Sequence, residues 1–382
     1  MLSISEKLII LLITLSSQIF PGNNIIFIPY ISITSLIIIL IYYVGFNKYQ
    51  LPTYSLILVF FLIIALVFQY DDLNSFIKQF SRLIYPWLLL FLFNLLILKN
   101  VNNEKKILSI LNFTSLSIYI ILIPDFFSLI YTLINNPNNL ILLKLSSIIY
   151  RETNTTAFLL LYAIIFRIEN KLSNFKEFSI TSFFLLLSFS RSAILMFFVY
   201  LIYKFFNKSF HRFKLINFKL LFSRLFPFAV LGAMLIIWIT TSVTLENLGG
   251  YSIALDDRSF FTRILLFSYI KYYLSTINLS EMINFLFGYG WSAYNDILKN
   301  LPFNYEGGTT GHTLIGVLPE YGFIYTCFLF LFFYIRAFRG FIADSILLGL
   351  SILAFFPFPY TAPIICLIQT HRKLNIALKE KL

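Results

Sequence analysis

The feature that most constrains this sequence is the recurrence of long apolar runs along almost its whole length. The hydrocarbon core of a bilayer is about 30 Å thick, and a helix needs about 20 mainly apolar residues to cross it. Hydrophobic residues make up 59% of the 382 residues and charged residues 12%, whereas soluble domains carry roughly 25% charged residues. The sequence therefore predicts an all-α, polytopic integral membrane protein and excludes a soluble enzyme.

Twelve apolar segments are candidate transmembrane helices, within a single membrane domain that covers residues 1–382. They span residues 4–20, 24–46, 52–69, 83–98, 107–134, 154–168, 178–190, 191–206, 223–242, 321–338, 341–356 and 360–370. Pro124 and Asp125 lie inside the fifth segment, so we expect a kink or a break there. The first segment lacks the small-residue cleavage pattern of a signal peptide, and we expect it to be a membrane anchor.

Lysine and arginine set the expected orientation, because positively charged loops stay in the cytoplasm. With both termini cytoplasmic, 20 of the 29 basic residues fall on the inner side, and 11 of the 17 acidic residues fall on the outer side. The positive-inside rule also accounts for the basic stretch at residues 204–224, so no nucleic-acid partner is expected. The outer connection at residues 243–320 is by far the longest, and long connections are usually functional.

His312 is the only histidine expected on the outer side, and it follows a glycine-rich stretch, Gly307 to Gly311. An imidazole titrates near neutral pH, so His312 is the natural outer group to accept a proton from a hydroxyl. The alternative is a structural hydrogen-bonding role. The stretch is no phosphate-binding P-loop, since the lysine and serine or threonine of that motif are missing.

Three outer arginines are candidates for binding an anion, because a guanidinium matches phosphate groups bidentately. Arg191 lies between two apolar runs, where it either faces a ligand cavity or reaches the outer headgroups. Arg263 opens an amphipathic stretch of the long loop and is the preferred second ligand. Arg258 follows two aspartates that can pair with it, which favours a structural role for this arginine. Glu320 either supports His312 or is an interface residue, and no acidic or cysteine cluster predicts a metal site or cofactor.

The arrangement of the C-terminal half resembles the O-antigen polymerase (Wzy) and O-antigen ligase superfamily. The resemblance covers residues 178–339 and depends on a Ser-Arg pair at the outer end of a span, a basic inner loop, one further span and a large outer loop. One departure is that Thr313 follows the histidine where members often have asparagine. The matching residues are Ser190, Arg191, Arg263, Gly288 to Trp291, His312, Glu320 and Gly322.

The resemblance implies a multi-pass enzyme of the bacterial inner membrane, with residues 243–320 as a large periplasmic loop. It implies metal-independent, inverting glycosyl transfer from undecaprenyl-pyrophosphate-linked oligosaccharides, with a second such molecule as acceptor. His312 is then the general base, and Arg191, Arg263 and Arg258 bind the pyrophosphate. Membrane lipids and a chain-length regulator protein are the further expected partners.

Two other functions stay open at this stage. An O-antigen ligase shares the design and transfers the polymer to the lipid A core; we prefer the polymerase because the chain is short and shows no additional acceptor-binding module. A flippase for lipid-linked oligosaccharides is the rival from another class. We expect a flippase to distribute charged residues through both halves and to have short outer loops, unlike this sequence.

Overall fold

The computed structural model describes residues 2–16, 103–137, 153–213, 218–240, 282–288 and 318–353. All regular structure in these residues is helical, and no strand occurs among them. The predicted all-α class is therefore confirmed for this part of the chain. The described helices are α1 (Ile4–Ser16), α5 (Glu104–Ile121), α6 (Ile123–Asn135), α7 (Thr153–Glu169), α8 (Phe175–Leu187), α9 (Arg191–Phe213), α10 (Phe218–Thr240), α13 (Met282–Phe287), α15 (Leu318–Phe338) and α16 (Ile342–Leu353).

Helices occupy eight of the twelve predicted apolar segments. The other four segments, at residues 24–46, 52–69, 83–98 and 360–370, lie outside the described residues. The largest extensions past the predicted ends are at α9, which continues to Phe213, and at α10, which begins at Phe218. The reason is that hydropathy marks apolar surface, whereas the lysine and arginine residues at these two helix ends are good helix formers.

Residues Lys105–Asn135 form the only stretch of the described chain that is long and apolar enough, by length and composition, to count as a candidate membrane span. It has 31 residues and a mean hydropathy of 2.0. The helix is interrupted between α5 and α6, where Pro124 has no N–H to offer to the preceding turn. The N–H of Leu122 still bonds to the carbonyl of Ile118 at 3.1 Å. The predicted break at Pro124 is therefore confirmed, as a local interruption between two consecutive helices.

The chain divides into two compact units, and the boundary falls inside α9. The first unit contains α1, α5, α6, α7, α8 and the start of α9 up to Phe197. The second unit contains α9 from Phe198 onward together with α10, α13, α15 and α16.

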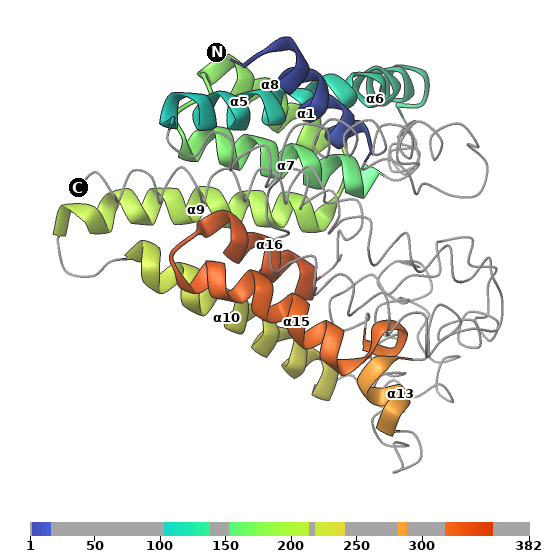
Figure 1. The fold of residues 1–382 in the computed structure, drawn as a ribbon, viewed down its shortest axis with the longest axis vertical. Helices are drawn as coiled ribbons and strands as arrows, with labels where there is room; N and C mark the ends of the chain where they lie inside the picture. Colours follow the sequence, from blue (N-terminus) through green and yellow to red (C-terminus); the bar gives the residue numbers. More distant parts are fainter. Residues whose placement is uncertain are drawn as a thin grey trace, which may run out of the picture. The chain divides into compact units, whose positions relative to one another are not determined.

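In the first unit α5 packs against α1 and α7, and α7 packs against α8 (Figure 1). Every side chain from Ala157 to Phe166 in α7 is buried. A helix that is apolar on all sides is buried on all sides, so α7 forms the core of this unit. Asparagines begin two of its neighbours: Asn103 accepts the N–H of Lys106 at 3.1 Å, and Asn174 accepts that of Glu177 at 2.8 Å. Both are N-caps, which satisfy backbone donors that a helix start leaves unpaired.

In the second unit α10 packs along α16, α15 packs against both, and α13 packs against α15 (Figure 1). All residues of α16 from Ile342 to Ile352 are buried. Gly349 permits a close helix contact, because a Cβ there would lie 2.5 Å from Cε1 of Phe226 in α10. Tyr203 of α9 packs on Phe222 of α10, with ring centroids 4.9 Å apart. Aromatic rings and a small residue thus define the helix contacts of this unit.

Large apolar side chains are exposed on helices of both units. Single exposed apolar residues are ordinary in folded proteins, whereas groups of them on one helix are typical of surfaces that contact a partner or a membrane. On α6 the exposed fraction reaches 69% for Phe127, 70% for Tyr131 and 71% for Ile134. Similar residues on other helices are Ile180, Phe183, Ile202, Phe205, Leu225, Ile236, Leu331 and Ile335.

Candidate functional site

The structure describes the side chain of one predicted site residue, Arg191. It is the first residue of α9 and is exposed. Glu320 belongs to the first turn of α15, but its side chain lies outside the described residues. His312, Arg258 and Arg263 also lie outside them. Whether these groups lie close together therefore stays a prediction, and the turn before Arg191 is the part of the site that can be built from contacts.

A tight turn between α8 and α9 holds Arg191. Ser188 donates its hydroxyl to the carbonyl of Leu185 at 2.6 Å and accepts the N–H of Ser190 at 3.3 Å. Phe189 between the two serines has a φ of 50°, a left-handed conformation that costs an L-residue about 1–2 kcal/mol. Strained residues of this kind persist where the surroundings hold them, and they are found preferentially at functional sites.

The start of α9 is electrostatically suited to an anion. The first N–H groups of a helix have no partner within the helix, and the macrodipole makes this end positive. Arg191 adds a full positive charge there, and the first turn contains no acidic residue. The buried hydroxyl of Ser190 makes no hydrogen bond to any group in the described part of the chain. Ser190, with a buried hydroxyl, and Arg191, which is exposed, are thus consecutive residues at a helix start, the kind of position at which proteins bind phosphate groups.

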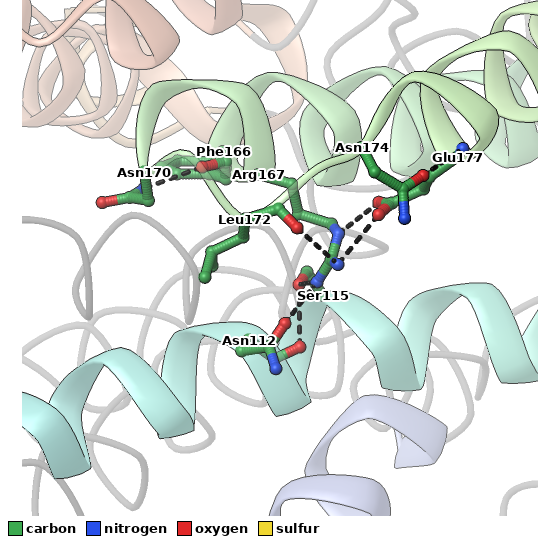
Figure 2. A network of polar contacts seen from close by, with 8 residues as sticks. All are labelled: Asn112, Ser115, Phe166, Arg167, Asn170, Leu172, Asn174 and Glu177. Atoms are coloured by element: carbon green, nitrogen blue, oxygen red, sulfur yellow. Dashed lines mark hydrogen bonds and ion pairs between the residues drawn. The ribbon is translucent and has the colours of Figure 1, made fainter.

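A second arginine of the first unit, Arg167, has a different environment (Figure 2). Its Nε donates to Oε1 of Glu177, and one terminal nitrogen donates to Oε2 of Glu177 at 2.9 Å and to the carbonyl of Leu172 at 3.2 Å. The other terminal nitrogen donates to Oδ1 of Asn112 at 2.5 Å and to Oγ of Ser115 at 3.0 Å. A guanidinium has five N–H donors, so every donor of Arg167 is used within the protein.

The Arg167 network joins the end of α7 to the middle of α5 and to the start of α8. Only 6% of Arg167 is exposed, and no donor is left for a ligand. Arg191, at the other end of α8, is exposed. Since α8 has 13 residues, it separates the two guanidiniums by on the order of 20 Å at 1.5 Å per residue. Arg167 is therefore a structural residue, whereas Arg191 has the accessibility that a ligand-binding residue requires.

An ion pair lies at two helix starts of the same unit. Nζ of Lys106, in the first turn of α5, lies 2.8 Å from Oε1 of Glu6, in the first turn of α1. The pair brings these two helix starts together, so α1 and α5 begin at the same end of the unit.

A buried pair, Asp125 and Thr156, was not singled out as functional by the sequence analysis. The Thr156 hydroxyl donates to Oδ2 of Asp125 at 2.5 Å, and neither residue is accessible to solvent. The pair joins the first turn of α6 to the first turn of α7. The sequence contains one indication of this pair: Asp125 lies inside an apolar segment, and acidic groups in such segments are costly in a bilayer and need a partner.

In the second unit, two glycines of the motifs that carry the family resemblance are in contact. Gly288, the first residue of the Gly288 to Trp291 turn, follows α13, and Gly322 of the Glu-Tyr-Gly motif lies inside α15. A Cβ placed on Gly322 would lie 2.5 Å from the backbone nitrogen of Gly288. Both motifs are visible in the sequence, but nothing in the sequence indicates that they are in contact.

No metal site can be assigned from the part of the chain that the structure describes, where no group of three or more His, Cys, Asp or Glu could hold an ion. The chain matches no protein-family model, no curated protein and no solved structure.

Proposed function

We propose that this protein is an O-antigen polymerase, a glycosyltransferase of the bacterial inner membrane that joins undecaprenyl-pyrophosphate-linked repeat units into polysaccharide. The observation that carries the proposal is Arg191, an exposed arginine at the start of a 23-residue helix whose first turn holds no acid. A cation at this end interacts unfavourably with the helix macrodipole, which costs roughly 0.3–1 kcal/mol of stability. A bound pyrophosphate offsets that cost, because both the guanidinium and the helix N-terminus attract it.

The proposed reaction is a single displacement. The hydroxyl oxygen of the acceptor sugar attacks the anomeric carbon of the donor, and the bond from that carbon to the pyrophosphate oxygen breaks with inversion. The leaving pyrophosphate takes the electron pair, and His312 accepts the hydroxyl proton. Arg191 and Arg263, with Arg258 as a third cation, stabilise the charge that develops on the leaving group, so no metal ion is needed. Glu320 has the supporting role of orienting the imidazole.

A multi-pass membrane location is part of this proposal, with both termini cytoplasmic and the reaction on the periplasmic side. The exposed apolar residues of α6, α9 and α10 support it, because lipid tails supply the covering that these side chains need. The arrangement of helix ends in the first unit supports the membrane location as well. The predicted topology puts the starts of α1, α5 and α8 and the end of α7 on one side. In agreement with this, the Glu6–Lys106 pair joins the starts of α1 and α5, and the Arg167–Glu177 pair joins the end of α7 to the start of α8.

The substitution His312→Ala tests the catalytic base. We expect long polymer to disappear while lipopolysaccharide with a single repeat remains, because removing a general base costs about 10²- to 10⁴-fold in rate. His211→Ala and His371→Ala are matched controls on the predicted cytoplasmic side, and they should leave the polymer ladder unchanged. A normal ladder in His312→Ala cells would reject the role of the base.

The same gel separates the competing functions. Loss of every periplasmic repeat unit would favour a flippase. Loss of all attachment to the lipid A core, with polymer still made on its carrier, would favour a ligase.

Arg191→Lys tests pyrophosphate binding. An ammonium keeps the charge but lacks the planar fork that binds a diphosphate bidentately, so we expect much shorter polymer. Arg339→Lys, at an exposed position after α15, is the control and should behave like the parent protein. Near-normal polymer length in Arg191→Lys would contradict bidentate binding.

A further inference from the structure

The contact between Gly288 and Gly322 is made by backbone atoms alone. A Cβ on Gly322 would lie 2.3 Å from the carbonyl oxygen of Leu286, 2.5 Å from the carbonyl carbon of Phe287 and 2.5 Å from the nitrogen of Gly288. Backbone atoms cannot rotate out of the way as a side chain can, so any side chain at Gly322 forces the two segments apart. We call this contact, between the end of α13 and Gly322, the glycine joint.

The backbone conformations at the joint give a second, separate reason for glycine at these positions. Gly322 has a φ of 78° and Gly288 a φ of 90°, which L-residues with a Cβ adopt only with strain. At Gly322 the helical path of α15 is interrupted. Steric space and backbone conformation thus independently require glycine at Gly322.

Neighbouring contacts hold the joint from both sides. The rings of Phe285 in α13 and Phe323 in α15 stack with centroids 5.3 Å apart. The hydroxyl of Thr326 donates to the carbonyl of Gly322 at 2.8 Å, which satisfies a backbone acceptor at the interruption. Gly288 and Gly322 are themselves buried. The contact is therefore a packed interface and not an incidental approach of two loops.

The joint has a consequence for the chain between its two sides. The polypeptide leaves the joint at Gly288 and returns to it at Gly322, so both ends of residues 289–321 are fixed at one point. This stretch contains His312, ten residues before Gly322, and Glu320, two residues before it. Fixing the ends of a chain segment limits the arrangements that its residues can adopt.

We infer that the glycine joint is a positioning element for the glycosyl transfer proposed above, on which this inference rests. The joint ties α13 to α15 and so fixes the base of the segment that carries His312. Opening it should slow the chemical step, because misplacing a catalytic group by about 1 Å can cost on the order of 10²-fold in rate. Donor binding should change little, because the three proposed pyrophosphate ligands, Arg191, Arg258 and Arg263, all lie outside residues 289–321.

Three glycine-to-alanine substitutions separate the possible effects. Gly322→Ala places a Cβ where it clashes with backbone atoms and where φ is positive. Gly340→Ala places a Cβ at a positive φ of 88° without a clash, because its nearest neighbour is Cδ1 of Leu220 at 3.5 Å. Gly232→Ala adds neither, because nothing lies within 4 Å of a Cβ at that position. Comparison of the three variants isolates the clash at the joint.

The assay uses the full chain reconstituted in liposomes, with lipid-linked repeat units extracted from cells that lack this protein. We expect Gly322→Ala to lower kcat by about 10- to 100-fold while the KM for the glycolipid stays within about twofold of the parent value. Gly232→Ala and Gly340→Ala should keep both constants within about twofold, as substitutions away from such contacts do.

A rescue distinguishes positioning from general damage. In the Gly322→Ala protein, Phe285→Cys and Phe323→Cys are introduced with Cys327 and Cys366 changed to alanine, and a short thiol-reactive linker then joins α13 to α15. Cross-linking should restore a large part of kcat, and the same cysteines without the linker should not.

The outcomes separate the two proposals. A kcat in Gly322→Ala equal to that of Gly340→Ala, or a slow Gly322→Ala protein that the linker fails to restore, overturns the positioning role even if His312→Ala is inactive. A His312→Ala protein with full polymerising activity rejects the proposed function itself, and the positioning inference fails with it.

Discussion

Replacing Arg167 by methionine should destabilise the first unit strongly. The substitution leaves the carboxylate of Glu177 without its bidentate partner, in a position where only 17% of that side chain is exposed. Removing one member of a buried ion pair costs about 3–5 kcal/mol, because the remaining charge stays desolvated. The half-buried acceptors Asn112 and Leu172 also lose their donor, which adds less than the roughly 1–3 kcal/mol of a fully buried unsatisfied group. Relaxation toward water reduces these costs, so we expect about 3–5 kcal/mol in total.

Two further variants show whether this loss comes from the unpaired charge. Arg167→Met combined with Glu177→Met removes both charges, and apolar pairs of similar volume often replace buried ion pairs at little cost. The double variant should therefore be more stable than Arg167→Met alone. Lys105→Met removes an exposed cation from the start of α5, in the same unit, and it should change stability by no more than about 0.5 kcal/mol.

The measurement is unfolding of the purified protein in mixed micelles by titration with SDS, followed by tryptophan fluorescence. The reasoning would be refuted by an Arg167→Met protein within about 1 kcal/mol of Lys105→Met, a difference too small for a buried, unpaired carboxylate. A double variant less stable than Arg167→Met would refute it as well, since the cost would then lie in lost packing.

Three other substitutions have effects that follow from single contacts, and the same titration measures them. Thr156→Val removes the hydroxyl that donates to Asp125 at 2.5 Å and should cost about 1–3 kcal/mol, whereas Thr156→Ser should keep most of the stability. Asn174→Ala removes the N-cap of α8 and should cost about 1 kcal/mol, with Asn174→Asp close to the parent protein. Gly349→Ala should cost about 1–3 kcal/mol by overpacking against Phe226, and Phe226→Leu in the same chain should recover part of it. A Gly349→Ala protein as stable as the parent would show that the ring moves aside freely.

The candidate site illustrates how far sequence reasoning reaches. Arg191 was found from the sequence because a guanidinium between two apolar runs is unusual by itself. The strain at Phe189 and the buried hydroxyl of Ser190 were not found, because both depend on how the chain turns between two helices. The roles of His312, Arg258 and Arg263 stay predictions, since these residues lie outside the described part of the chain.

Local properties of the sequence determined the helical class, the positions of the described apolar helices and the break at Pro124. Apolar run length and a missing N–H act on neighbouring residues, so they can be read without knowing the fold. Only the tertiary structure decided that Arg167 is structural and that Gly288 meets Gly322. The acceptors of Arg167 on α5 lie 52 and 55 residues away along the chain, and in the sequence its charge does not differ from that of the other basic residues between apolar segments. Contacts between residues so far apart depend on which helix faces pack together, and that choice is made by the fold as a whole.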